Sequence, residues 1–493
     1  MKNTTYKVLG LIMLLFVLGA CGDFLNVNVS PNSTVSPPAR TILAAATGEL
    51  GFHMGSDIHR FTSEWVQQFT GAGAAGTQTL EYARFNVTAT DMNNCFRGGI
   101  WGDALSDFQA LRLATEGTSP KYSGIAKIAQ AFLFSIAVDA WGDLPFTEAL
   151  KYGANVTPKY DKSEDIYAAL PGLIDEGIAD LNLPNSLTEL VPGADDLIYG
   201  GNLSRWIKFG NSLKLRIYIK YYPTNSAFAD AQIAALLASG ATFMASNADN
   251  FSCAFEASVN RTNAIDQFEK SRNNQFWPTT TIVDIMNANA DPRRPFYFTA
   301  SPAAGQYTGL TPGILITTTP STSRMHTYLR GASTPAANGG ANGYAGDKAQ
   351  RMFTFAEHNL NLAEYYARTA QPALAQTAYQ AAITASMQDA TVLAADITTY
   401  LAGPKGSLTG TLATDLVLIM TEKYVSNYGV AVQPWSDWRR TNIPTLVLPV
   451  GAVLTNLPRI LPYSDLERVT NPNTPPRDVA NLTSPGVFWD PGN

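Results

Sequence analysis

The chain has 493 residues, of which 45% are hydrophobic and 15% are charged, so it carries enough apolar material for a large globular core. The formal net charge of −6 at pH 7 argues against a nucleic-acid partner, because a phosphate-binding surface needs clustered Lys and Arg, and no Lys/Arg run here is longer than two. Length alone is compatible with one large domain or with several smaller ones.

The N-terminal segment has the pattern of a bacterial export signal. Lys2 and Lys7 precede an almost uninterrupted apolar run, 8–18, and Leu-Gly-Ala-Cys then ends at Cys21. The run is too short to span a bilayer as a helix, and its positive start and small residues indicate a secretory signal over residues 1–20. The tetrapeptide resembles a lipobox, which predicts acylation of Cys21; an ordinary signal peptide with a chance cysteine is the alternative. No later stretch reads as a membrane helix.

Residues 21–40 are rich in Asn, Ser, Pro and Val and read as a tether, after which the pattern becomes helical. Apolar residues then recur at helical spacing, as with Ile58, Phe61 and Trp65. Gly142 and Pro145 supply a stop after one strongly apolar helix. Helices are predicted over 41–50, 56–69, 101–114, 125–140, 163–181 and 204–222.

Between about residues 223 and 350 the composition changes, and Ser, Thr, Asn, Gly and Pro accumulate. Long ordered loops in a compact protein are usually functional. We therefore expect irregular loops with local structure, carried on a helical frame. The aromatic residues scattered through this stretch are Phe276, Trp277, Tyr297, Tyr307, Tyr328 and Tyr344.

The clearest internal motif lies within 351–385 and resembles one tetratricopeptide repeat. Small Ala side chains let two helices approach closely, and aromatic side chains fill the gap toward the next pair. A generic helical hairpin is the alternative, and both interpretations predict stacked helix pairs. The Pro-rich tail from Thr441 is predicted to wrap over the helices. The motif residues are Leu362, Ala363, Tyr366, Ala375, Tyr379 and Ala382.

Local signatures of catalysis are missing from the sequence. It contains no G-x-S-x-G elbow and no Walker A motif, and the four histidines lack metal-ligand spacing, so we predict no metal and no cofactor. A glycosidase carboxylate pair stays open, because such pairs form only in three dimensions. Cys95 and Cys253 either pair or remain as buried thiols.

Two segments imitate functional motifs. Gly71–Gly76 matches G-x-G-x-x-G, but we expect helix at 63–69 and extended chain at 77–86, which is the wrong context for a dinucleotide site and favours a surface loop. The Trp435–Arg440 segment could pass for a catalytic cluster. Aromatic packing plus an Asp–Arg pair that locks a turn is the better interpretation.

Several segments match motifs that occur together in one family. They are Ala140–Phe146, Tyr160–Tyr167 with Asp175–Leu181, Lys208–Arg216 (with Gly210 for the usual Ala), Asp291–Arg294, Leu362–Arg368, Glu422–Tyr424, Trp435–Arg440 and Pro458–Pro462. With the lipobox, they resemble in the expected order the SusD/RagB nutrient-binding outer-membrane lipoproteins.

This resemblance implies a mainly α fold, in which tetratricopeptide-like helix pairs form a scaffold and long irregular loops form a shallow ligand face, with one SusD-like domain over 41–493. It implies a non-enzymatic, lipid-anchored protein at the cell surface that captures oligosaccharides as a lid on a SusC-like TonB-dependent outer-membrane transporter. A peptide-binding lid, a surface glycoside hydrolase and a purely structural repeat adaptor are the alternatives. The matched motifs belong to the scaffold and transfer no ligand residue.

Sugar chemistry suggests which side chains to examine. A flat aromatic ring covers the C–H face of a pyranose, while nearby polar groups bond its hydroxyls. Aromatic residues in loops and near helix ends are therefore the candidates, each with core packing as the alternative. The predicted ligand contacts are Trp65, Trp101, Trp277, Tyr307 and Tyr328.

Overall fold

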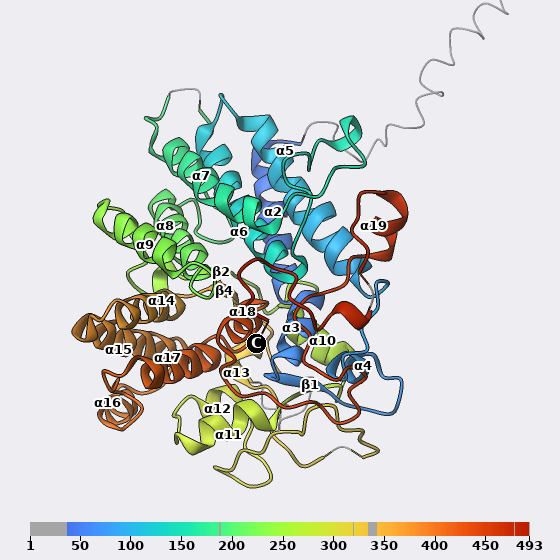
Figure 1. Cartoon of the computed structure of the whole chain (residues 1–493), viewed down its shortest axis with the longest axis vertical. Coiled ribbons are helices and arrows are strands. Elements are labelled where there is room, and N and C mark those ends of the chain that lie inside the picture. The colour runs from blue at the N-terminus through green and yellow to red at the C-terminus, as the bar shows by residue number, and fades with distance from the viewer. Residues whose placement is uncertain (1–36, 187–188, 319, 334–342, 478, 493) are drawn as a thin grey trace, which may run out of the picture.

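Among the described residues, nearly all of the regular secondary structure is helical (Figure 1). The structure is a computed structural model that describes residues 37–186, 189–318, 320–333, 343–477 and 479–492. The predicted signal peptide, Cys21 and nearly all of the tether lie outside these residues. Within them, the mainly α fold class predicted from the sequence is confirmed.

The described part of the N-terminal half is predominantly helical. Its helices are α2 (Ala39–Met54), α3 (Asp57–Trp65), α4 (Gln78–Ala83), the π-helix η1 (Asn93–Leu105), α5 (Ser106–Thr115), α6 (Pro120–Trp141), α7 (Ser163–Asn182), α8 (Leu203–Ile219) and α9 (Ser226–Ala238), with the 3₁₀ turns η2 (Tyr152–Ala154) and η3 (Asn247–Asp249). The helix expected over 101–114 is thus divided, and its first turns are π-helical.

The loop-rich middle carries more helix than its composition predicts. Here lie α10 (Ala264–Ser271), α11 (Thr280–Ala288), α12 (Arg294–Tyr297) and α13 (Thr327–Arg330). The C-terminal part contains α14 (Phe355–Arg368), α15 (Pro372–Asp389), α16 (Ala394–Ala402), α17 (Leu412–Ser426), α18 (Gln433–Thr441), α19 (Asp465–Thr470) and the 3₁₀ turn η5 (Val479–Asn481).

The centre of the N-terminal half is α6, whose residues from 121 to 141 are all buried. Gly124 faces Gly177 of α7, and a Cβ on either glycine would lie within 3 Å of the other's carbonyl oxygen, so glycine allows the two helices to touch. By length and composition α6 could cross a membrane, contrary to the prediction that no later stretch would. Because it is buried entirely within the protein, it is a core helix.

Antiparallel helix pairs form the scaffold. In the α14–α15 pair the predicted small residues Ala363, Ala375 and Ala382 are buried at the contact, and Tyr379 fills the space beside them. The pair packs against α8 on one side and α17 on the other, and Figure 1 shows these helices stacked one above another. This arrangement matches the predicted stack of helix pairs.

Buried ion pairs lock the C-terminal helices together. Arg440 of α18 contacts Glu364 of α14 and Asp437, each at 2.9 Å, and Lys423 of α17 lies 3.0 Å from Asp437. Burial alone would raise the pKa of Glu364, but Arg440 and Arg368 hold it at about 2. The Asp–Arg pair predicted for the Trp435–Arg440 segment is therefore present, but it lies within the helix α18 and does not lock a turn.

The strands are short. β1 (Phe69–Gly71) pairs antiparallel with β3 (Phe276–Pro278), and β2 (Phe251–Cys253) pairs antiparallel with β4 (Gln350–Phe353). Each pair therefore ties an N-terminal or central segment to one much later in the chain. Cys95 and Cys253 are both buried free thiols, so the disulfide alternative is not realised.

The secondary structure predicted on the two sides of the Gly71–Gly76 loop is wrong. A strand precedes the loop and the six-residue helix α4 follows it, the reverse of the predicted helix and extended chain. The amide of Gly76 already donates to Glu81 Oε1 at 3.2 Å. A carboxylate at this position repels phosphate, so the segment is still a surface loop rather than a dinucleotide site.

Candidate ligand-binding site

Three of the five predicted contact residues lie inside the protein. Trp65 packs edge-on against Trp435 and donates from Nε1 to the Tyr82 carbonyl at 3.3 Å. Trp277 lies beneath the guanidinium of Arg324, 3.9 Å from the ring centre. These two residues and Tyr328, the third, are at most 3% exposed, so none presents a ring face to a ligand in this structure.

Tyr328 is held between two neighbours. Its ring stacks on Tyr297 with centroids 4.4 Å apart, and the Arg351 guanidinium covers its other side at 3.9 Å. This packing connects the loop-rich middle to β4, so Tyr328 serves the scaffold.

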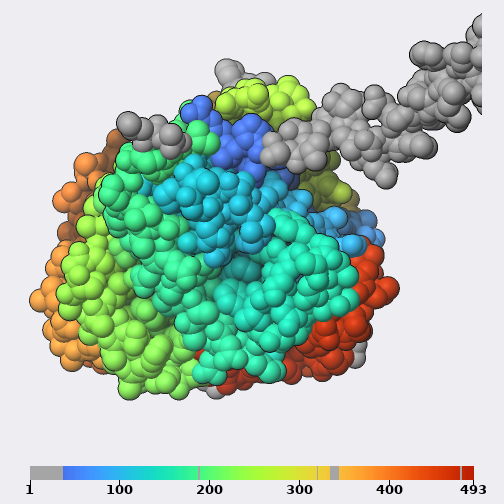
Figure 2. Space-filling view, turned by 90° about the horizontal axis from the view of Figure 1, so that it is seen from above, coloured from blue at the N-terminus to red at the C-terminus, as the bar shows by residue number. Residues whose placement is uncertain are grey.

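Trp101 is partly exposed and lines a cavity of about 110 Å³. It lies on η1, where its ring contacts Phe96 and Phe134. The opposite wall comes from the segment after α6 and includes Pro145 and Leu150. Figure 2 shows a hollow between these two parts of the chain. The cavity is small for a sugar ring, so Trp101 can contribute an edge rather than a complete site.

Tyr307 is also partly exposed, and it is attached to the turn between α11 and α12. Its carbonyl accepts a hydrogen bond from Asn287 Nδ2 at 2.9 Å, and the Arg294 guanidinium lies 5.5 Å from its ring centre. The same turn forms one wall of a larger cleft.

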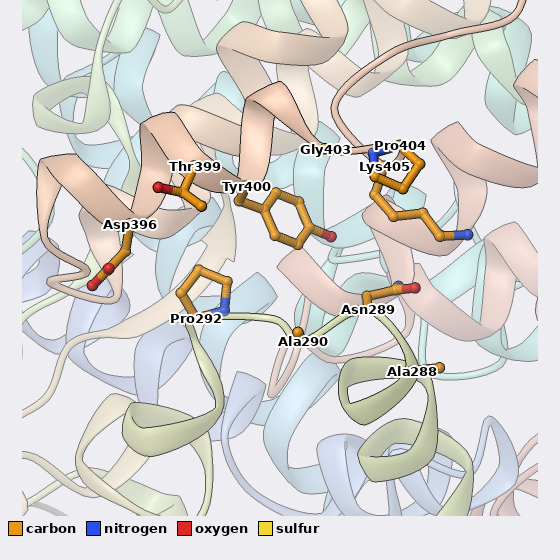
Figure 3. Close-up of a pocket in the computed structure, with 10 residues that line it drawn as sticks. All are labelled: Ala288, Asn289, Ala290, Pro292, Asp396, Thr399, Tyr400, Gly403, Pro404 and Lys405. Atoms are coloured by element: carbon orange, nitrogen blue, oxygen red, sulfur yellow. The ribbon is translucent and has the colours of Figure 1, made fainter.

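This cleft, which we call the Tyr400 cleft, lies between the α11–α12 turn and the C-terminal end of α16, and has a volume of about 360 Å³ (Figure 3). That volume falls within the usual range for small-molecule sites. Tyr400 lies in the middle of the view, with Pro292 and Asn289 across from it and Lys405 beyond its hydroxyl end. The lining residues are Ala288, Asn289, Ala290, Pro292, Asp396, Thr399, Tyr400, Gly403, Pro404 and Lys405.

A buried ion-pair cluster fixes the first wall of the cleft. Arg293 is fully buried, with Nη2 2.6 Å from Asp291 and Nη1 2.6 Å from Glu422 of α17. Arg293 Nη1 also donates to Ser386 of α15 at 2.8 Å. These bonds tie the turn to α15 and α17. Pro292 lies between Asp291 and Arg293 in the chain and is therefore held rigidly on the cleft wall.

The second wall is the end of α16 and the loop that follows. Tyr379 donates to the Lys405 carbonyl at 2.9 Å, and Gln376 donates to the Gly406 carbonyl at 2.9 Å. A Cβ at Gly406 would lie 2.1 Å from the Leu401 carbonyl oxygen, so only glycine lets the loop fold back on the helix. The loop is therefore fixed to α15 of the helix-pair scaffold.

The cleft combines a ring face with hydrogen-bonding groups. Burial raises the pKa of Tyr400, so its hydroxyl stays protonated and can donate. Within the described part of the chain this hydroxyl has no hydrogen-bond partner. Asn289 and Lys405 supply further donors on the hydroxyl side of the ring, while prolines and alanines supply apolar wall. Such a mixture suits a ligand with both C–H faces and hydroxyls.

The sequence did not identify Tyr400 or Lys405 as site residues. In Thr-Thr-Tyr-Leu-Ala the tyrosine occupies a helical pattern and reads as core, and the turn Asp291–Arg294 was assigned to the scaffold only. The Gly-Pro-Lys-Gly that follows α16 signals a loop, but nothing local shows that this loop faces the turn before α12. Tertiary contact alone brings the two walls together.

A wider depression of about 680 Å³ lies over α10 and offers a weaker site. Its lining includes the polar residues Asn260, Gln267 and Lys270. The aromatic residue there, Tyr344, is buried beneath Arg330, whose guanidinium is 4.0 Å from the ring centre. It therefore lacks an accessible ring on which a sugar can stack.

Carboxylates gather elsewhere, between α2, η1 and α5. Burial and the neighbouring Asp107 and Asp103 raise the pKa of Glu49 to about 7, and His53 Nε2 lies 2.9 Å from Asp103. The Tyr400 cleft itself contains one carboxylate, Asp396, so a two-carboxylate glycosidase arrangement is not formed there. Among the described residues no group of three or more His, Cys, Asp or Glu side chains is arranged to hold a metal ion.

The fold and the cleft define a helical-repeat protein that presents an open cleft beside its stacked helix pairs. The family model described as "Starch-binding associating with outer membrane" (SusD-like) matches residues 31–463. The chain therefore belongs to the SusD-like family, as its motifs indicated.

Solved structures show the same fold. A chitin-binding SusD homologue from Flavobacterium johnsoniae superposes with a TM-score of 0.75 at 18% identity, covering 92% of this chain and 98% of the other. A SusD homologue from Bacteroides uniformis gives 0.72 at 21% identity, covering 91% and 99%. A further structure, described as a chitin-binding protein, gives 0.71 at 21% identity, covering 90% and 100%. No curated protein sequence matches the chain.

Proposed function

We propose that this protein is a non-enzymatic, lipid-anchored glycan-binding protein of the outer-membrane surface, which captures oligosaccharides for a SusC-like TonB-dependent transporter. The observation that carries the proposal is the Tyr400 cleft, a rigid, sugar-sized recess with one ring face and unengaged donors. Family membership supports it, and two of the structural neighbours are described as chitin-binding.

A sugar ring would lie with its C–H face against Tyr400 and Pro292. Its hydroxyls, or an acetamido carbonyl, would accept from Lys405 and Asn289. Because the walls are fixed by Arg293 and Tyr379, little ordering entropy is lost on binding, which favours affinity in an open site. Trp101 and Tyr307, both partly exposed, remain proposed secondary contacts.

Calorimetric titration with chitin and starch oligosaccharides tests the cleft. Tyr400→Ala should weaken binding by about 2 kcal/mol, roughly thirtyfold, because it removes the ring face. Tyr400→Phe keeps the ring and should lose only about 1 kcal/mol for the hydroxyl. Tyr152→Ala, at an exposed tyrosine far along the chain, is the matched control and should bind normally. Unchanged affinity in a folded Tyr400→Ala protein would place the site elsewhere.

An assay for cleavage by the wild-type protein distinguishes ligand capture from catalysis. A reducing-end assay with purified protein and these oligosaccharides should detect no cleavage, and robust cleavage would replace the proposal with the glycoside hydrolase alternative. Binding of peptides in place of sugars would favour the peptide-binding lid.

The anchor is tested separately. Cys21→Ala should release the protein from the outer-membrane fraction in cells that lack the transporter, because acyl chains are its only proposed attachment. Full retention of the variant in that fraction would contradict acylation at Cys21.

A further inference from the structure

A second cavity lies where the C-terminal end of α15 meets α13 and the chain that leads into β4. Its volume is about 360 Å³, which is within the usual range for small-molecule sites. It shares no lining residue with the Tyr400 cleft, so it is a separate site. We call it the Asp347–Lys348 cavity, and its wall includes Thr327, Tyr328, Gly331, Asp347, Lys348 and Thr391.

Buried bonds to Arg351 hold the wall segments of this cavity together. Arg351 of β4 forms an ion pair with Asp389, the last residue of α15, and its Nη1 donates to the Tyr328 carbonyl of α13 at 3.1 Å. The Tyr328 hydroxyl donates to Asp389 Oδ2 at 3.3 Å. The cavity is therefore preformed, and because Arg351 and Asp389 satisfy each other, neither charge is left for a ligand.

Asp347 and Lys348 carry opposite charges and both line the cavity, yet no ion pair joins them in the described part of the chain. Neither the carboxylate nor the ammonium has a hydrogen-bond partner among the described residues. A Cβ at Gly331 would lie 1.9 Å from Asp347 Oδ1, so the absence of a side chain there makes room for the carboxylate. Burial and the nearby Arg351 lower the pKa of Lys348, against the opposing effect of Asp389 and Asp347, so its charge is incompletely compensated.

Thr391 supplies a hydroxyl from a strained backbone position just after α15. Its φ is 64°, a left-handed conformation that is a genuine outlier for a β-branched residue. The Val392 amide donates to the Met387 carbonyl at 2.9 Å, which closes a helix-ending turn in which glycine usually takes the position of Thr391. Strained residues of this kind concentrate at ligand-binding sites. The Thr391 hydroxyl has no hydrogen-bond partner among the described residues, so it is available to a ligand.

The two charges together select the kind of ligand. Asp347 repels a simple anion such as phosphate, and Lys348 repels a divalent cation. A sugar would find no ring face to stack on, because the aromatic residue in the wall, Tyr328, is 3% exposed. A molecule that carries both an ammonium and a carboxylate satisfies the two groups at once. A free α-amino acid carries both of these groups on one carbon atom, and it is small enough for this cavity.

We propose that the Asp347–Lys348 cavity binds a free α-amino acid. The ammonium of the ligand donates to the Asp347 carboxylate, and its carboxylate accepts from the Lys348 ammonium and the Thr391 hydroxyl. The cavity is separate from the Tyr400 cleft, so this assignment does not rest on glycan capture. The protein then has a site for a second class of nutrient besides the proposed glycan.

Calorimetric titration of the purified protein with each of the standard L-amino acids tests the assignment. We expect binding, and for the tightest ligand the decarboxylated amine and the deaminated acid should bind at least about tenfold more weakly, because each lacks one charge. Lys348→Gln and Asp347→Asn should weaken binding of that amino acid to the same extent. Lys151→Gln, at an exposed lysine that lines neither cavity, is the matched control and should bind normally.

Variants of Thr391 separate ligand binding from folding. Thr391→Gly removes the hydroxyl and the backbone strain together, so the melting temperature should rise while the affinity for the amino acid falls several-fold. Thr391→Ser keeps the hydroxyl and should keep the affinity. A residue with a purely structural role would not move stability and affinity in opposite directions.

Three results would overturn the amino-acid site. The first is that no amino acid binds, or that the singly charged analogues bind equally well. The second is unchanged affinity in folded Lys348→Gln and Asp347→Asn proteins, which would place the amino acid elsewhere. The third is loss of oligosaccharide binding in these variants, which would assign the cavity to the glycan. A protein that binds an amino acid here but no oligosaccharide supports this site and contradicts glycan capture alone.

Discussion

The helix-pair scaffold and the loop-rich middle use polar residues in opposite ways. In the scaffold, charged side chains are buried and satisfied by each other, as Arg440 is by Glu364 and Asp437. In the middle, charge disappears from the loops over 295–323, and in the adjoining Tyr400 cleft the Tyr400 hydroxyl has no hydrogen-bond partner among the described residues. Groups that are fully satisfied hold a fold together, whereas groups left free can hold a ligand.

Breaking the scaffold's ion pairs should have the largest effect. Arg440→Ala removes the cation that Glu364 and Asp437 share and leaves each buried carboxylate with one other partner, Arg368 or Lys423, so the variant should cost about 3 kcal/mol in the free energy of unfolding. Urea denaturation measures the change. Arg261→Ala is the control, because its pair with Glu256 is exposed and should contribute at most about 1 kcal/mol. Equal effects in the two variants would contradict the structural role of the buried network.

Alanine variants of Trp65 in α3 and Trp101 within η1 should distinguish a scaffold residue from a surface residue. Trp65→Ala removes a fully buried ring and should cost about 3–5 kcal/mol. Trp101→Ala, at a partly exposed ring, should cost about 1 kcal/mol and should reduce oligosaccharide affinity if its cavity is a secondary contact. Thermal unfolding and titration on both variants decide this. A normal affinity in Trp101→Ala would remove Trp101 from the proposed contacts.

Sequence patterns predicted the scaffold well because its signals are local. Helical spacing, the small residues at Ala363 and Ala375, and the family motifs all lie within single segments. Which aromatic rings are exposed was predicted less well, because whether a ring such as Trp277 is covered depends on Arg324, which is 47 positions later in the chain. Likewise, the Tyr400 cleft forms only where α16 meets a turn more than a hundred residues earlier. Aromatic residues in polar surroundings were therefore mistaken for exposed ones.

The stability of the folded protein should depend on pH through the carboxylates that lie between α2 and α5. Burial, with Asp107 and Asp103, raises the pKa of Glu49 from 4.5 to about 7. A raised pKa means that the folded state holds the proton more tightly than the unfolded state, so this contribution to stability is complete below about pH 4.5 and is lost as pH rises through 7. Melting temperature measured from pH 5 to 8 should fall less in Glu49→Gln than in wild type. Identical pH profiles would show that the carboxyl does not titrate there.

The smallest effect is expected in the glycine loop that resembles a cofactor motif. Gly76 has a positive φ of 83°, and a Cβ there would meet nothing within 4 Å, so Gly76→Ala should cost only backbone strain, about 1 kcal/mol. Gly73→Ala should cost more, because its Cβ would lie 2.6 Å from Thr77 Oγ1. Neither variant should change oligosaccharide affinity, since no residue of the loop lines the Tyr400 cleft and the Gly76 amide is engaged by Glu81. Denaturation and titration on the two variants measure both quantities. Loss of affinity in Gly76→Ala, at a position where nothing structural is displaced, would show that the loop itself contacts the ligand.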